Sequence, residues 1–219
     1  MKPTRTFPEF FKHMAQCGFS PKMCIDVGAA NGTQSIYDAF PEAYHIAFEP
    51  LPDFHEELLR TLAPFRHEVH QVALMDKPGC RTLARHPDGY GSSLMHRGKK
   101  GAPNLVEVPV TTLDEVMQGR NMKGDVLLKL DCQGADLFVL KGGARTIKNS
   151  NVIIVEASFF KFRGKTHPEF FEIISFMKER GFVVYDILDG LFRPLDGALG
   201  QVDLAFVKEK SRFRSKQYW

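Results

Sequence analysis

Short apolar runs alternate along this chain with segments in which apolar residues recur at helical spacing. The runs predict buried strands, and the periodic segments predict helices with one buried face. The predicted strands are 23–27, 44–48, 69–74, 125–131, 151–157, 182–187 and 202–207, and helices are predicted at 33–40, 52–62, 135–140 and between Thr166 and Gly181. Because strands and helices alternate, we expect a three-layer α/β fold with a mostly parallel seven-stranded sheet.

Capping and turn residues refine these boundaries. Thr112 with Glu115 matches a capping box, as does Thr166 with Glu169, and each pair predicts a helix N-terminus. Asp189–Gly190 predicts a hairpin-type turn, after which Leu191–Pro194 is expected to pair nearby. At 219 residues, the chain is expected to form one domain, 1–219.

Both ends of the chain lie outside the alternating pattern. Residues 1–20 are expected to be a helical lead-in in which Phe10, Phe11 and Met14 pack on the sheet edge. Residues 208–219 form a basic tail, which we expect to be a solvated end.

A second interruption, 76–104, lies inside the chain, where Gly, Pro and basic residues are frequent and 79–84 is predicted as a short extra strand. Long irregular segments in compact domains are usually functional, so we expect 76–104 to be a lid facing the substrate. Its basic residues favour an acceptor with a phosphate or carboxylate, the alternative being a solvated loop. These basic residues are His96, Arg97, Lys99 and Lys100.

Composition narrows the class of protein. The formal net charge is +3, which gives no strong attraction to nucleic acid, and no nucleic-acid partner is expected. No apolar run reaches the length of a membrane span, and no secretory signal is legible, so a cytoplasmic protein is expected. The four cysteines lack paired ligand spacing, so no metal site is expected. They are Cys17, Cys24, Cys80 and Cys132.

The chemistry-bearing stretch begins at the end of the first predicted strand. Asp26, Gly28 and Gly32 follow the pattern Asp-x-Gly-x-x-x-Gly before a predicted helix. This layout is typical of a tight turn that leads into a helix N-terminus and binds a nucleoside cofactor. Ala30 stands where a dinucleotide fingerprint requires its second glycine, so NAD is disfavoured. Glu49 ends the next strand, 21 residues after Gly28, where an acidic residue hydrogen-bonds ribose hydroxyls.

A second group of charged residues lies at the ends of two later strands. Lys129 and Asp131 are two positions apart and project to one face of their strand, and Glu156 follows the apolar run of the next strand. Because parallel strands end at one sheet edge, Asp131 and Glu156 are expected at one site with Lys129 behind them. The alternative is a structural ion pair that fixes the loop ends.

The order of these motifs resembles the FkbM family of S-adenosylmethionine-dependent methyltransferases. The resemblance rests on 25–32 (Ile-Asp-Val-Gly-Ala-Ala-Asn-Gly), 48–50 (Phe-Glu-Pro), 72–74 (Val-Ala-Leu), 92–94 (Ser-Ser-Leu), 110–114 (Val-Thr-Thr-Leu-Asp), 129–134 (Lys-Leu-Asp-x-x-Gly) and 155–156 (Val-Glu). It implies a Rossmann-like class I methyltransferase fold and S-adenosyl-L-methionine as cofactor. The family pattern often has glutamate where this chain has Gln133, which weakens any expectation of a metal or a second carboxylate base in this loop.

The resemblance also implies site residues and an activity. The cofactor-binding residues would be Asp26, Gly28, Ala29, Asn31, Gly32, Glu49, Pro50, Ala73 and Ser93. The expected reaction is O-methylation of a hydroxyl on a sugar, glycan or natural product. Asp131 and Glu156 are the candidate catalytic residues, and His86 or His96 is an alternative base. Nucleic-acid methylation and a non-catalytic, cofactor-binding regulatory or scaffold role remain alternative functions.

Overall fold

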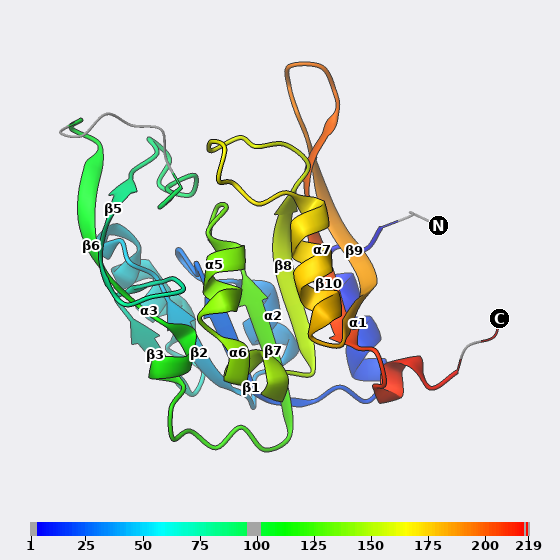
Figure 1. Ribbon diagram of the computed structural model, residues 1–219. Helices are drawn as coiled ribbons and strands as arrows, with labels where there is room; N and C mark the ends of the chain where they lie inside the picture. The colour runs from blue at the N-terminus through cyan, green and yellow to red at the C-terminus, as the bar shows by residue number, and fades with distance from the viewer. Residues whose placement is uncertain (1–3, 96–101, 217, 219) are drawn as a thin grey trace.

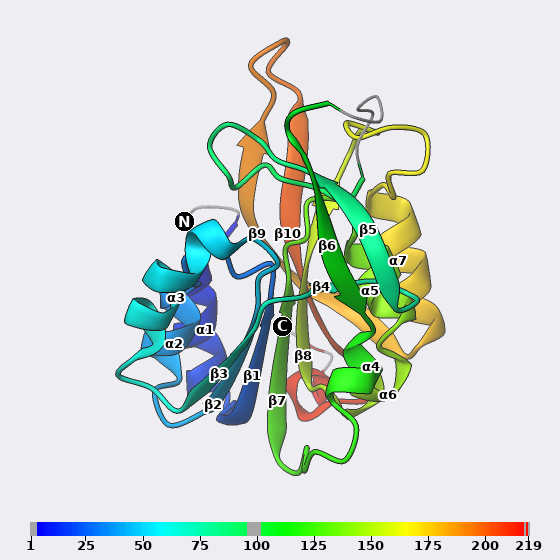
Figure 2. The same ribbon diagram turned by 90° about the vertical axis from the view of Figure 1, so that its left-hand side faces the viewer.

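The computed structural model describes residues 4–95, 102–216 and 218 and shows a seven-stranded sheet with helices on both faces (Figures 1 and 2). The strand order is β3–β2–β1–β7–β8–β10–β9, in which β10 runs antiparallel to both of its neighbours and the other pairs are parallel. The strands are β1 (Pro21–Val27), β2 (Tyr44–Phe48), β3 (His67–His70), β7 (Asp125–Leu130), β8 (Val152–Ser158), β9 (Phe182–Phe192) and β10 (Leu199–Lys208). The predicted three-layer, mostly parallel α/β fold is confirmed.

The helices form two layers (Figure 2). One face of the sheet is covered by α1 (Phe7–Gln16), α2 (Gln34–Ala39) and α3 (His55–Leu62), and the other by α4 (Leu113–Val116), α5 (Asp136–Lys141), α6 (Ala144–Asn149) and α7 (Phe170–Glu179). Short 3-10 helices lie at Pro52–Phe54 and Arg212–Arg214. The lead-in helix is confirmed as α1, and its Phe10, Phe11 and Met14 are buried in the first layer.

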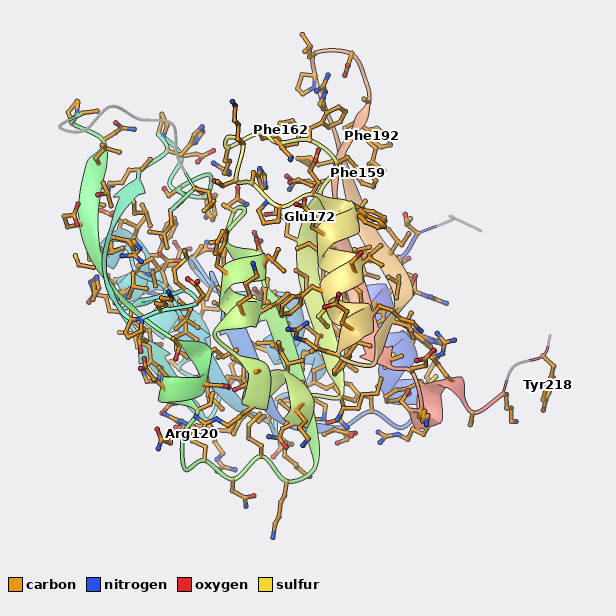
Figure 3. The ribbon with its side chains drawn as sticks, viewed as in Figure 1. Arg120, Phe159, Phe162, Glu172, Phe192 and Tyr218 are labelled. Atoms are coloured by element: carbon orange, nitrogen blue, oxygen red, sulfur yellow. The ribbon has the colours of Figure 1, made fainter. Side chains whose placement is uncertain are left out.

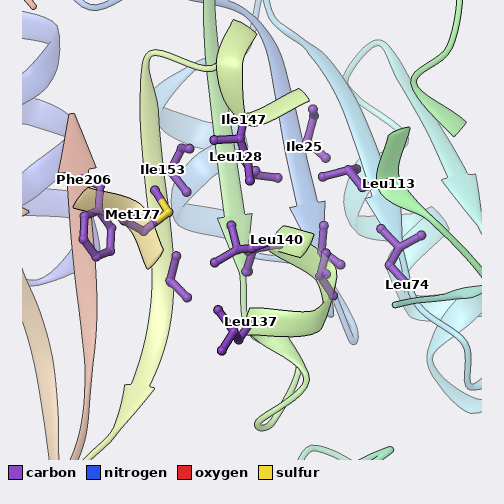
Figure 4. Packing of buried hydrophobic residues seen from close by; sticks show 14 of the residues in the cluster. Ile25, Leu74, Leu113, Leu128, Leu137, Leu140, Ile147, Ile153, Met177 and Phe206 are labelled. Carbon is purple, nitrogen blue, oxygen red and sulfur yellow. The ribbon is translucent and has the colours of Figure 1, made fainter. Parts of the chain in front are cut away.

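Alternation along the strands decides which side chains reach each layer. Ile25, Leu128 and Ile153 belong to the core under α4–α7 (Figure 4), and their sequence neighbours belong to the core under α1–α3. Lys129 follows the alternation and lies on the α1–α3 side. By the same alternation, Asp26, Glu156 and Asp203 lie on this face of the sheet with Lys129.

The predicted strand 69–74 is wrong as a single element. β3 ends at His70 in the main sheet, and Ala73–Leu74 (β4) pairs with β6 (Leu105–Thr111) in a separate three-stranded sheet of order β4–β6–β5. β5 (Gly79–Ala84) completes that sheet, so the expected insertion is partly regular. A continuous apolar run cannot reveal that its two halves pair with different partners.

Two predicted boundaries are also wrong. The N-cap of α7 is Glu169, whose capping box is with Glu172 and not with Thr166. Asp189–Gly190 lies inside β9, because Gly190 pairs with Val202 and Leu188 with Asp203, which leaves Asp189 as a bulge with φ 33°. The chain instead turns at residues 193–198.

The C-terminal tail is docked in part, contrary to the expected solvated end. Arg212 forms an ion pair with Asp125 and donates to the carbonyl of Gly18 at 3.0 Å. Phe213 packs against Phe19 with ring centroids 6.0 Å apart. Among the described residues, no helix is long and apolar enough to cross a membrane.

Candidate active site

The loop after β1 is fixed between the ends of β2 and β7. The backbone N–H groups of Gly28 and Ala29 donate to the carbonyl oxygen of Phe48 at 3.0 and 3.1 Å. Gly28 has φ +74°, and an ideal Cβ at this position would lie 2.0 Å from the carbonyl oxygen of Asp131. Only glycine allows this approach, so the loop and the end of β7 form one wall.

Glu49 follows β2 and braces the same loop. Its Oε2 accepts the N–H of Ala30 at 3.0 Å, and its Oε1 accepts the N–H of Leu51 at 2.8 Å. Ala30 holds a left-handed φ of +47° at this contact. Burial raises the pKa of Glu49 above the usual value for glutamate, and the two N–H donors oppose that shift.

A cavity lies between this loop, Glu49–Leu51, the small sheet and the end of β7. Its wall includes the following expected site residues: Gly28, Glu49, Pro50, Ala73 and Asp131. The insertion closes one side with Gly89, Tyr90, Ser92 and Leu94. The floor and sides are mostly apolar, as expected for a cavity that holds an adenosine moiety.

Several expected cofactor residues lie behind the wall and do not line the cavity: Asp26, Ala29, Asn31, Gly32 and Ser93. Asp26 is buried and accepts the hydroxyl of Tyr37 at 2.7 Å and the N–H of Thr33 at 3.4 Å. Ser93 donates its hydroxyl to the carbonyl of Gln133 at 2.7 Å. Both side chains therefore fix the loops that form the wall.

Lys129 connects the two groups of charged residues. Its buried ammonium lies 3.2 Å from Asp26 Oδ1 and 3.7 Å from Asp131 Oδ2, and it donates to the carbonyl of Gly28 at 3.3 Å. Burial alone would lower the pKa of Lys129, but Asp26, Asp131 and Asp203 outweigh it and raise that pKa above its ordinary value. Lys129 is thus a permanent cation behind the cavity wall.

The structure brings Asp131 and Glu156 together through Gln133. The side-chain amide of Gln133 donates to Asp131 Oδ1 at 3.1 Å and to Glu156 Oε1 at 3.3 Å. Glu156 is buried and also accepts from Gln201 Nε2 at 2.5 Å, whereas the side chain of Asp131 is 38% exposed. Of the two candidate bases, only Asp131 lines the cavity.

Burial raises the pKa of two carboxyl groups next to Asp131, those of Glu156 and Asp203. Burial, with Asp131 and Asp136 nearby, raises the pKa of Glu156 well above the ordinary value. Burial, with Asp131 nearby, likewise raises the pKa of Asp203 to about 7. Burial therefore disfavours the ionised form of both Glu156 and Asp203. Glu156 therefore acts as a hydrogen-bonding partner, and Asp131 is the carboxylate with access to the cavity.

Sequence reasoning missed three residues of this cluster: Gln133, Arg163 and Asp203. Asp203 had a signal, since it is the one charged residue in the predicted strand 202–207. Gln133 was noted only as a departure from a pattern, and Arg163 lies in an irregular loop with no local signal. The cluster 96, 97, 99 and 100 lies outside the described residues. Across residues 4–95, 102–216 and 218, no three His, Cys, Asp or Glu side chains are placed to hold a metal ion.

Comparison with known families accounts for this arrangement. Residues 26–184, more than half of the chain, match the model of the methyltransferase FkbM domain. The chain belongs to the FkbM methyltransferase family. It is therefore an S-adenosylmethionine-dependent methyltransferase with the class I fold, as the sequence motifs indicated.

Solved structures similar to this FkbM domain share its fold. A protein described as an rRNA methylase from Clostridium thermocellum superimposes with a TM-score of 0.54 at 8% identity, over 95% of this chain and 100% of that one. A protein described as an RNA methyltransferase from Pyrococcus horikoshii gives 0.50 at 18% identity, over 92% and 82%. At sequence identities this low, the similarity shows a shared fold and nothing about function. Among curated proteins, none matches the sequence significantly.

The cavity of this FkbM domain fits the family's cofactor. The backbone of Gly28 and of the left-handed Ala30 lies at the cavity wall. Two N–H donors hold the Glu49 carboxylate at the same wall. Each oxygen of Glu49 keeps lone pairs that could accept ribose hydroxyls. When bound, S-adenosylmethionine supplies an electrophilic methyl group whose leaving group is a neutral thioether.

Proposed function

We propose that this protein methylates a hydroxyl oxygen on a sugar, glycan or natural product. The observation that carries the proposal is the place of Asp131, whose partly exposed carboxylate lines the cavity beside the cofactor loop. A hydroxyl is a weak nucleophile until its proton is removed, and a carboxylate at this wall can accept that proton. The acceptor oxygen then attacks the methyl carbon as the carbon–sulfur bond breaks.

The cofactor residues have two kinds of role in this proposal. Gly28 and Glu49, with Pro50 and Ala73, contact the cofactor, and the carboxylate of Glu49 accepts ribose hydroxyls. Ala29, Asn31 and Gly32 shape the loop. Asp26 acts through Lys129 and Tyr37, and Ser93 acts through Gln133, because their side chains are already engaged with these partners.

The charges around Asp131 favour a small acceptor over a nucleic acid. Lys129 and Arg163 are the cations that act on the carboxyl cluster, and they are engaged with Asp26 and Gln133. A phosphate backbone would meet the Asp131 carboxylate without a free cation from either residue. Phe159, Phe162 and Phe192 lie beyond the same end of the sheet (Figure 3), and Phe162 and Phe192 are exposed, so they offer apolar surface to a small acceptor and to a nucleobase alike.

Methyl transfer from labelled S-adenosylmethionine tests the proposal. The acceptors would be methyl glycosides, phenolic natural products, single-stranded RNA and duplex DNA. We expect label in an ether of a glycoside or phenol and none in nucleic acid. Label in RNA or DNA alone would establish the alternative. Calorimetry on the same protein should detect S-adenosylmethionine and S-adenosylhomocysteine but not NAD, and a protein that binds the cofactor yet labels no acceptor would support a regulatory or scaffold role.

A further inference from the structure

The side chain of Gln133 lies between the two candidate carboxyl groups in a fixed orientation. Arg163 donates to Gln133 Oε1, and a guanidinium can only donate, so the amide oxygen faces Arg163. The NH2 group then faces the carboxyl cluster, with one hydrogen for Asp131 and one for Glu156. Gln133 itself has a left-handed φ of +51°, a backbone conformation that residues other than glycine rarely adopt.

Arg163 also reaches the insertion. It lies between β8 and α7, and its second terminal nitrogen donates to the carbonyl of Gly91 at 2.9 Å. Gly91 is next to Ser92, which lines the cavity, and Ser93 donates its hydroxyl to the Gln133 carbonyl. The side chain and the backbone of Gln133 are therefore both tied to the segment that covers the cavity.

From these contacts we propose that Gln133 is a positioning residue that holds Asp131 beside Glu156, and that Arg163 couples this alignment to closure of the insertion over the cavity. The inference rests on the proposed function, since it assigns Asp131 the acceptor's proton. An amide here supplies one hydrogen bond to each carboxyl group without adding a charge. Glutamate at this position, common in the family pattern, would add a third carboxyl group to the pair.

The surrounding charges explain why an amide suits this position. Asp136 lies beneath the turn and Asp203 on β10, and both add negative potential to the pair. Lys129 and Arg163 are the cations that offset it. A neutral donor that contacts both carboxyl groups stabilises the ionised form of Asp131 without another charge.

Two substitutions of Gln133 test the positioning role. Gln133→Leu removes both hydrogen bonds, and Gln133→Glu keeps the shape but adds a charge. A hydrogen bond to a charged group corresponds to a factor of about 10 to 100, so we expect Gln133→Leu to lower kcat by about that factor. The acid limb of its pH–rate profile should move to higher pH, because the ionised base has lost a donor. Gln133→Glu should lose more activity at neutral pH.

A matched control and a rescue separate this role from simple damage. Gln201→Leu removes a similar amide donor from Glu156 but none from Asp131, so its acid limb should move far less. Millimolar Mg²⁺ or Mn²⁺ should recover part of the activity of Gln133→Glu, because a cation can then bridge the added carboxylate and Asp131, and should not help Gln133→Leu. Calorimetric affinity for S-adenosylhomocysteine should be retained in all three variants.

Arg163→Lys tests the coupling. Lysine keeps the charge but cannot donate to Gln133 Oε1 and to the carbonyl of Gly91 from two separate nitrogens. We therefore expect a lower kcat, and faster hydrogen exchange at 89–93 in the complex with S-adenosylhomocysteine. The positioning role would be overturned if Gln133→Leu kept the wild-type kcat and pH–rate profile. It would also be overturned if the acid limb moved equally in Gln133→Leu and Gln201→Leu. Unchanged exchange and turnover in Arg163→Lys would overturn the coupling. All kcat values are measured with the glycoside or phenol that the wild-type protein methylates fastest. If the wild-type protein methylates none of these acceptors, the proposed function is overturned instead.

Discussion

Gly28 and Asp131 touch through the backbone: a Cβ on Gly28 would lie 2.0 Å from the carbonyl oxygen of Asp131. The loop that we propose to face the cofactor and the strand end that carries the candidate base are therefore in direct contact. Lys129 reinforces this contact, since its ammonium reaches both the Gly28 carbonyl and the Asp131 carboxylate. A change at position 28 should disturb both halves of the site.

Gly28→Ala is expected to lower the free energy of unfolding by about 2–4 kcal/mol, because overpacking adds to the strain of a left-handed alanine. Affinity for S-adenosylhomocysteine should fall as well. Gly119→Ala is the matched control: its φ is +76°, but no atom lies within 4 Å of the added Cβ. This control should cost only about 1 kcal/mol and leave cofactor affinity unchanged. Equal effects of the two variants in urea unfolding and calorimetry would contradict the account.

Glu49→Ala is expected to weaken cofactor binding by about 1–3 kcal/mol, since ribose hydroxyls and two N–H groups lose their acceptor. The wild-type affinity should also depend on pH. The binding form of Glu49 is the ionised one, and its pKa is raised, so affinity should decline on acidification at a higher pH than an ordinary glutamate would cause. Calorimetry across pH 4–8 measures both effects. Glu57→Gln, on the exposed side of α3, is the control and should bind normally.

Asp203→Asn is expected to stabilise the protein in a pH-dependent way. The pKa of Asp203 in the folded protein, about 7, lies above its ordinary value, so the folded state keeps a proton that the unfolded chain has released. At low pH, where both states hold this proton, the Asp203 carboxyl group does not destabilise the fold. Stability is lost as the pH rises toward and through 7, because only the folded state still holds the proton. The gain of Asp203→Asn over wild type should therefore grow between about pH 4 and 7, to about 1–3 kcal/mol. Urea unfolding that shows the same gain at pH 4 and 8 would contradict this assignment.

Local signals in the sequence predicted the parts of the site that depend on single turns and strand ends. The spacing of Asp26, Gly28 and Gly32 predicted the loop, because a tight turn before a helix demands glycine at fixed positions. Glu49 and Asp131 were expected at one edge because parallel strands bring their carboxyl ends together, and both line the same cavity. The expected proximity of Asp131 and Glu156 follows from the same rule and is confirmed by their shared partner Gln133.

Features that depend on the choice of a distant partner could not be predicted. Residues 69–74 form one apolar run, yet its halves pair in two sheets. Asp189–Gly190 carries a turn signal, but its place opposite Val202 makes it a bulge. Arg163 meets Gln133 and Gly91 only after three loops have folded together, and no spacing in the chain reports such a contact.

Asp131→Asn, assayed for turnover, cofactor affinity and melting temperature on one preparation, tests the central claim most directly. Asparagine keeps the shape of Asp131 but removes its charge and basicity. If Asp131 accepts the proton of the acceptor hydroxyl, kcat should fall about 10²–10⁴-fold while calorimetric affinity for S-adenosylhomocysteine stays close to wild type. A variant with a lower melting temperature and full turnover per folded molecule would contradict the claim and leave Asp131 as a structural partner of Lys129.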